Sequence, residues 1–87
     1  MDTQTIERTT LSNLIYNENY ARKVLHFIKG TYFEVREERI IFEEISNFVD
    51  KYKKIPTQTS LEIEVGERKD LSEIEYKKVV DIIKTLN

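Results

Sequence analysis

Residues 34–56, EVREERIIFEEISNFVDKYKKIP, contain the pattern that decides the fold. Apolar side chains recur in this segment at the i, i+4, i+7 and i+11 positions, flanked by two more: Ile41, Ile45, Phe48 and Tyr52, with Phe42 and Val49. This spacing is typical of a helix that packs one apolar face against other helices. Pro56 then prevents the helix from continuing. The segment therefore predicts a helix from Glu34 to Tyr52.

The chain before this segment predicts two more helices. The first begins near Thr3 or Thr5 and turns five residues to one side: Glu7, Leu11, Leu14, Ile15 and Glu18. An asparagine of Asn17-Glu18-Asn19 can cap a second helix, which is expected to stop at Gly30. Its inward stripe is predicted to hold Tyr20, Val24, Phe27 and Ile28. The connector Thr31-Tyr32-Phe33 follows, and we expect both of its aromatic rings to fill the core.

The chain after this segment predicts one or two further helices. Thr57 to Ser60 offer several N-caps for a short element through Leu61, Ile63 and Val65, although its alternation also fits a strand. Ser72 and Glu75 then match a capping box. The helix that they open is predicted to bury Tyr76, Val79, Ile82, Ile83 and Leu86. Together these patterns predict an all-α fold, a compact bundle of four to five short helices in a single domain over residues 1–87.

Composition limits what such a domain can be. The chain has 87 residues, 14 Lys and Arg against 16 Asp and Glu, and no cysteine. One modest core is all that this length supports, and disulfides or cysteine-bound zinc are excluded. The net charge of −2 gives no general attraction to nucleic acid or anionic lipid. Because no apolar run approaches the roughly 18 residues of a membrane span, and no signal peptide is evident, we expect a cytoplasmic protein.

Candidate catalytic groups are sparse. His26 is the only histidine, and we expect it to face water without an orienting partner. The paired carboxylates lie at adjacent or alternate positions and are expected to be solvated faces: Glu37 with Glu38, Glu43 with Glu44, and Glu62 with Glu64. A phosphate-binding loop is excluded because Gly30 and Gly66 stand far apart and neither is followed by lysine. The sequence therefore predicts no catalytic, cofactor-binding or metal-binding residues and no cofactor.

Binding surfaces are the remaining possibility. The basic cluster Lys51, Lys53 and Lys54 could contact phosphates, but the end of a helix also favours cations. Ile40 and Ile74 lie off the apolar stripes of their helices and are the candidate interface residues. The alternative for both isoleucines is a helix that is packed over a wider arc.

Several motifs stand in a familiar order: Glu7, then Leu11-Ser12-Asn13-Leu14-Ile15 and Asn17, then Val24, the aromatic loop Gly30-Thr31-Tyr32-Phe33, Ile41-Phe42 with Ile45, and Lys54-Ile55-Pro56-Thr57. Over most of residues 6–87 the chain thus resembles the N-terminal domain of DnaB-type replicative DNA helicases, most closely their bacteriophage members. Ser12 departs from the glycine that bacterial members often carry. The motif remains a small residue at that position.

The resemblance implies a non-catalytic role. In that family the helical head is followed by a helical hairpin, a linker helix and a RecA-like ATPase domain, so this chain looks like an excised head. ATP and Mg²⁺ would belong to the ATPase domain of the implied parent, an ATP-dependent DNA helicase. Without the hairpin, the isolated domain is expected to be a weak oligomer or a monomer.

The implied partners follow from the same resemblance. Such domains form a collar on the hexameric ring, commonly a trimer of dimers, which supports ring assembly and docks primase in the primosome. Single-stranded DNA would be contacted only through the full-length ring, and no membrane is involved. If the gene is phage-encoded, the protein would act in the cytoplasm of the bacterial host.

Two other classes of function remain open. One is a free-standing small helical adaptor or inhibitor, and the helicase-binding domain of primase is a close variant because it resembles the same helical head. The other is a small nucleic-acid-binding domain that uses the Lys51–Lys54 cluster.

Overall fold

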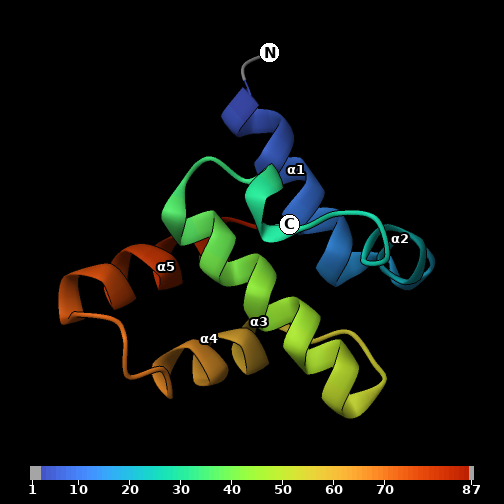
Figure 1. The fold of residues 1–87 in the computed structure, drawn as a ribbon. Coiled ribbons are helices and arrows are strands. Elements are labelled where there is room, and N and C mark those ends of the chain that lie inside the picture. The colour runs from blue at the N-terminus through green and yellow to red at the C-terminus, as the bar shows by residue number, and fades with distance from the viewer. Residues whose placement is uncertain (1–2, 87) are drawn as a thin grey trace.

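The computed structural model describes residues 3–86 as helices joined by short loops, without a strand in that range. The elements follow in the order α1 Thr3–Tyr16, α2 Glu18–Val24, the 3-10 helix η1 Gly30–Tyr32, α3 Arg36–Tyr52, α4 Gln58–Gly66 and α5 Glu73–Thr85. Helix α3 contacts α1, η1, α4 and α5, and it runs through the middle of the molecule in Figure 1. The predicted all-α fold is therefore confirmed.

Helix α3 is buried over a wider arc than one stripe. Ile41 and Ile45 are fully buried as predicted, and Phe42 beside them is buried too. Ile40 is only 4% exposed and belongs to the same core cluster. Because α3 has neighbours on two sides, the residue next to the stripe is covered as well. Of the two interpretations of Ile40, the helix packed over a wider arc is the one observed.

The apolar stripe of α3 becomes less buried towards the C-terminal end of the helix. Phe48 is half-buried, and Tyr52, predicted to be inward, is exposed. The two rings pack on each other with their centroids 4.6 Å apart. Figure 1 shows this end of α3 projecting away from α5, which explains why it has fewer neighbours. The helix ends at Tyr52 as predicted, because Lys53 turns into the left-handed region at φ 59° and its N–H donates to the Val49 carbonyl.

Helix α2 is shorter than predicted. The Asn17 side chain caps it by accepting from the Tyr20 N–H at 3.0 Å, but the helix ends at Val24 rather than at Gly30. The chain turns there, and Phe27, predicted to be in the core, is 84% exposed. In the connector, Phe33 is buried against Phe42 while Tyr32 stays exposed, so one aromatic ring fills the core instead of two.

Helices α4 and α5 begin at the predicted caps. The Thr57 side chain accepts from the Ser60 N–H, which makes the segment with two-fold alternation a helix. Ser72 and Glu75 form the predicted capping box. The inner face of α5 is buried as expected at four positions, Val79, Ile82, Ile83 and Leu86, while Tyr76 is exposed beside Gly66.

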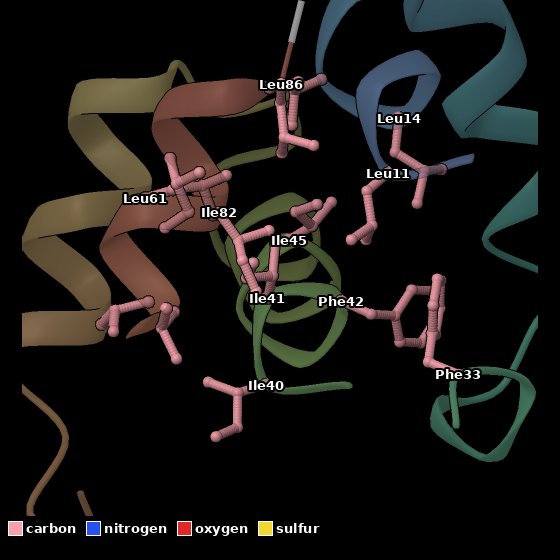
Figure 2. Packing of buried hydrophobic residues seen from close by; sticks show 14 of the residues in the cluster. Leu11, Leu14, Phe33, Ile40, Ile41, Phe42, Ile45, Leu61, Ile82 and Leu86 are labelled. Carbon is pink, nitrogen blue, oxygen red and sulfur yellow. The ribbon is translucent and has the colours of Figure 1, made fainter. Parts of the chain in front are cut away.

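One core joins all these elements. Figure 2 shows Leu11 and Leu14 of α1, Phe33, and the inner residues of α3 converging with Leu61, Ile82 and Leu86. Leu86 is also held by its backbone. Its carbonyl accepts from the Gln58 Nε2 at 2.6 Å and from the Tyr16 hydroxyl at 3.3 Å. The clamp joins α1 and α4 at the end of α5.

Candidate functional site

A buried ionic cluster lies between α1 and the start of α3. Glu38 is completely buried, and its Oε2 accepts from Arg8 Nε at 2.9 Å while Oε1 has no partner among the described residues. Burial raises the pKa of Glu38, because the interior disfavours the charged carboxylate, and Arg8 opposes that shift. The prediction of a solvated face is thus wrong for Glu38. It lies one helical turn before Phe42 on the side that faces α1.

Glu7 belongs to the same region and has a different task. Its side chain is buried on the predicted inner side of α1, and Oε1 accepts from the Glu34 backbone N–H at 2.8 Å. Val35, the N-cap residue of α3, offers no side-chain cap. Glu7 therefore fixes the chain that enters α3 by a charge-assisted hydrogen bond from another helix.

A second ionic cluster ties the loop between α4 and α5 to α3. Arg68 donates from Nε and Nη2 to both oxygens of Asp70, and from Nη1 to Glu44 at 2.8 Å and Glu43 at 3.3 Å. The hydrogen bond from Arg68 lowers the pKa of Asp70 to about 2, and the same partners raise the pKa of Arg68. Burial raises the pKa of Glu44. The sequence patterns did not point to this cluster; the Arg-x-Asp spacing of residues 68–70 was the available signal.

Each cluster joins segments that are distant in sequence. Three of the six glutamates considered for acid–base chemistry accept hydrogen bonds from arginines, Glu38 from Arg8 and the Glu43–Glu44 pair from Arg68. His26 is exposed as expected. Within residues 3–86 the structure shows no group of three side chains suited to hold a metal ion. The described helices also include none that is long and apolar enough to cross a bilayer.

The basic cluster at the end of α3 is consistent with the interpretation that its lysines stabilise the C-terminal end of the helix. Lys51, Lys53 and Lys54 are exposed, and Lys53 is itself the left-handed cap of the helix. The Lys51 Nζ lies 5.2 Å from the centroid of the Tyr52 ring. Cations at this position interact favourably with the C-terminal end of the helix dipole. Nucleic-acid binding by these lysines stays a prediction.

The two candidate interface residues differ in their exposure to solvent. Ile74 is 70% exposed on α5, pointing away from its buried stripe as expected. Ile40 instead forms part of the wall of a polar hollow beside Arg36 and Arg39. A third residue, Phe27, is more exposed than either, and sequence periodicity had placed it in the core. An interface role for Ile74 stays a prediction, whereas Ile40 is covered within the core of the domain.

Comparison with protein families identifies this fold. The model described as DnaB-like helicase N terminal domain matches residues 2–86, nearly the whole chain. The chain belongs to this family. Comparison with curated proteins and with solved structures gave no significant match. The resemblance to DnaB-type helicases is confirmed, while a closer relation to bacteriophage members stays a prediction.

The motifs that this DnaB-like domain shares with its family are packing motifs. Leu11 and Leu14 are fully buried, Ser12 between them is half-buried, and Ile41-Phe42 forms the centre of the core. Glu7 opens the motif and braces the entry to α3. The buried residues among them define the fold of the domain, while other motif residues, such as Tyr32 and Lys54, are exposed.

Proposed function

We propose that this chain is the non-catalytic collar domain of a hexameric replicative DNA helicase, where it supports ring assembly and docks primase. The family match over residues 2–86 carries the proposal. In the structure, two of the glutamates considered for catalysis, Glu38 and Glu44, accept hydrogen bonds from arginines of other segments. ATP, Mg²⁺ and single-stranded DNA would be bound by the ring of the parent protein, in the cytoplasm.

Weak contacts are sufficient for such a role. The large exposed apolar side chains are spread over the surface: Ile6, Tyr16, Phe27, Tyr32, Tyr52, Ile63, Ile74 and Tyr76. Single apolar residues of this kind are normal on protein surfaces and do not make a large patch, so contacts through them would be small. Attachment to a ring would raise the effective concentration of each head to about the millimolar range, so small interfaces between heads could form there. The trimer of dimers is one arrangement of such contacts.

The first test is the coding sequence that follows the codon for Asn87. The proposal expects a phosphate-loop motif, G-x-x-x-x-G-K-[ST], within roughly 100–200 codons, about the distance that one intervening hairpin and linker require. A stop codon at that point would contradict the proposal and favour the free-standing adaptor.

The second test compares the parent protein with a version that lacks residues 1–87. Native mass spectrometry should show that the deletion weakens the hexamer, and titration with fluorescent primase should show reduced binding. A helicase that lacks this domain and keeps both its hexamer and its primase affinity would contradict the proposal.

A further inference from the structure

The Arg39 side chain is held in place by backbone carbonyls rather than by a carboxylate. Its Nε donates to the Phe33 carbonyl and its Nη2 to the Glu34 carbonyl, both at 3.2 Å. Its aliphatic stem lies over Gly30 of η1, where an added Cβ would stand 3.4 Å from the Arg39 Cγ. Among the residues that the structure describes, no carboxylate pairs with Arg39, and its Nη1 has no partner. A guanidinium fixed in this way keeps its charge and free donors for a further acceptor.

Arg39 lines a polar hollow of about 190 Å³ between α3 and the loop that joins α4 to α5. Two other arginines line the same hollow, Arg36 from the first turn of α3 and Arg68 from the loop. Because one water needs only about 10–15 Å³, a hollow of this volume can admit a tetrahedral oxyanion. Guanidinium groups from two segments thus line one space of suitable size.

Two carboxylates also line the hollow, and Arg68 binds both of them. Asp70 accepts from the Nε and Nη2 of Arg68, and Glu43 accepts from its Nη1 at 3.3 Å. Arg68 and these two acids therefore largely satisfy one another. The positive charge that is left for a ligand comes from the other two arginines of the hollow.

Of those two, Arg36 has one weak competitor. Its Nη1 donates to Glu75 at 2.8 Å, and both side chains of this pair are partly exposed. Exposed pairs contribute little to stability, so an anion that enters the hollow can compete with Glu75 for Arg36. The remaining N–H groups of Arg36 have no acceptor among residues 3–86 and need none displaced.

We propose that this hollow binds a phosphomonoester dianion, with Arg39 and Arg36 as its donors. A planar carboxylate matches one guanidinium fork, whereas a phosphate presents three oxygens and can accept from two guanidinium groups at once. Its double charge also favours it over the single charge of Glu75. The phosphate can belong to a small metabolite or to a phosphorylated side chain of another protein. The site does not depend on the proposed collar role.

The first test is NMR titration of the ¹⁵N-labelled 87-residue chain with inorganic phosphate at constant ionic strength. At about pH 7.5 the phosphate is mostly dianionic. The Nε–Hε signals of Arg39 and Arg36 should shift and saturate, with a dissociation constant of about 1–10 mM because the site is open to water. Dimethyl phosphate, which carries a single charge like the nucleic-acid backbone, should bind about tenfold more weakly.

Loss of either donor should weaken binding. R39M and R36M should each raise the dissociation constant about tenfold, because each removes charge-assisted hydrogen bonds. R39M also removes the two bonds to backbone carbonyls, so its thermal unfolding must be compared with the wild type; R36M keeps those bonds. R22M is the matched control, because Arg22 is exposed and paired with a glutamate on α2, and it should leave phosphate binding unchanged.

Removal of the competing carboxylate should have the opposite effect. E75Q keeps the capping box, since glutamine can also accept from the Ser72 N–H, but it releases Arg36. Phosphate binding should then tighten about threefold. E18Q removes the corresponding partner of Arg22 and should have no effect.

The source of the phosphate is tested with two probes, glycerol phosphate and a short phosphoserine peptide. Tighter binding of the peptide would assign the site to a phosphorylated protein, and equal affinity would assign it to small phosphate compounds. Three results would overturn the proposal: no saturable shift up to about 50 mM phosphate, dimethyl phosphate binding as tightly as phosphate, or an affinity that neither R39M nor R36M lowers. The coding-sequence test of the proposed function is unaffected by any of them.

Discussion

The two ionic clusters beside α3 use the same chemistry in opposite surroundings. Arg8 and Glu38 meet in the interior between α1 and α3, where one carboxylate oxygen lacks a partner. Arg68 meets Asp70 at the surface, where the Asp70 side chain is 54% exposed, while Glu44 on its other side is largely covered. Burial raises the pKa of Glu38, while the hydrogen bond from Arg68 lowers that of Asp70. The surroundings of a carboxylate therefore decide whether its pKa is raised or lowered.

The largest effect is expected for R8M, which leaves the buried Glu38 without its cation. Removing one partner of a buried pair is strongly destabilising, and the partial exposure of Arg8 reduces the effect to about 2–3 kcal/mol. Urea unfolding at pH 7 measures it. R22M, which breaks the exposed pair with Glu18, is the control and should cost below about 0.5 kcal/mol. A loss below about 1 kcal/mol for R8M would show that water reaches Glu38.

A smaller decrease in the free energy of unfolding is expected for R68M. This substitution leaves three carboxylates near one another, but two of them are well exposed, so we expect about 1 kcal/mol. Urea unfolding in low salt and in about 1 M NaCl should show the difference from the wild type shrinking as the charges are screened. An R68M loss as large as that of R8M would remove the contrast between the clusters.

The interior cluster should respond to pH in one direction. Because the pKa of folded Glu38 lies above its ordinary 4.5, its contribution is fully present below pH 4.5 and is lost as the pH rises through the folded pKa. The stability of the wild type relative to E38Q should therefore increase as the pH is lowered from 7 to 4.5. Urea titrations at several pH values measure this difference. A difference that is independent of pH would contradict the burial of a charged Glu38.

The surface cluster should respond in the other direction, with the smallest effect. The pKa of Asp70 is lowered from 3.8 to about 2, so its contribution is present above pH 3.8 and is lost as the pH falls towards 2. Thermal unfolding between pH 5 and about 2 should show the wild type losing its advantage over D70N in that interval. An advantage that persists at pH 2 would rule out the Arg68–Asp70 hydrogen bonds as its source.

Local chemistry made part of the fold predictable. The end of α3 before Pro56 and the capping box of Ser72 and Glu75 depend on neighbours within a few residues, so the sequence alone locates them. The apolar stripe identified Ile41 and Ile45 as core residues for the same reason. Helical patterning also predicted the all-α class, and the family motifs added the resemblance to the DnaB-like domain.

Other features depend on segments that are distant in sequence. Periodicity continued past Val24, but the turn there sends Phe27 outward, and the helical spacing contains no sign of that turn. Glu38 is buried because α1 supplies Arg8, thirty residues away. Arg68 finds Glu44 across twenty-four residues. Both ionic clusters, and the hollow beside Arg39, therefore required the structure.

The clamp on Leu86 has a consequence for synthesis. Its side chain completes the core, and its carbonyl receives hydrogen bonds from Tyr16 of α1 and Gln58 of α4. The ribosome makes these partners in order, and Leu86 is made after both. A nascent chain thus holds an open core until residue 86 leaves the exit tunnel, and only then can the domain close as one cooperative unit.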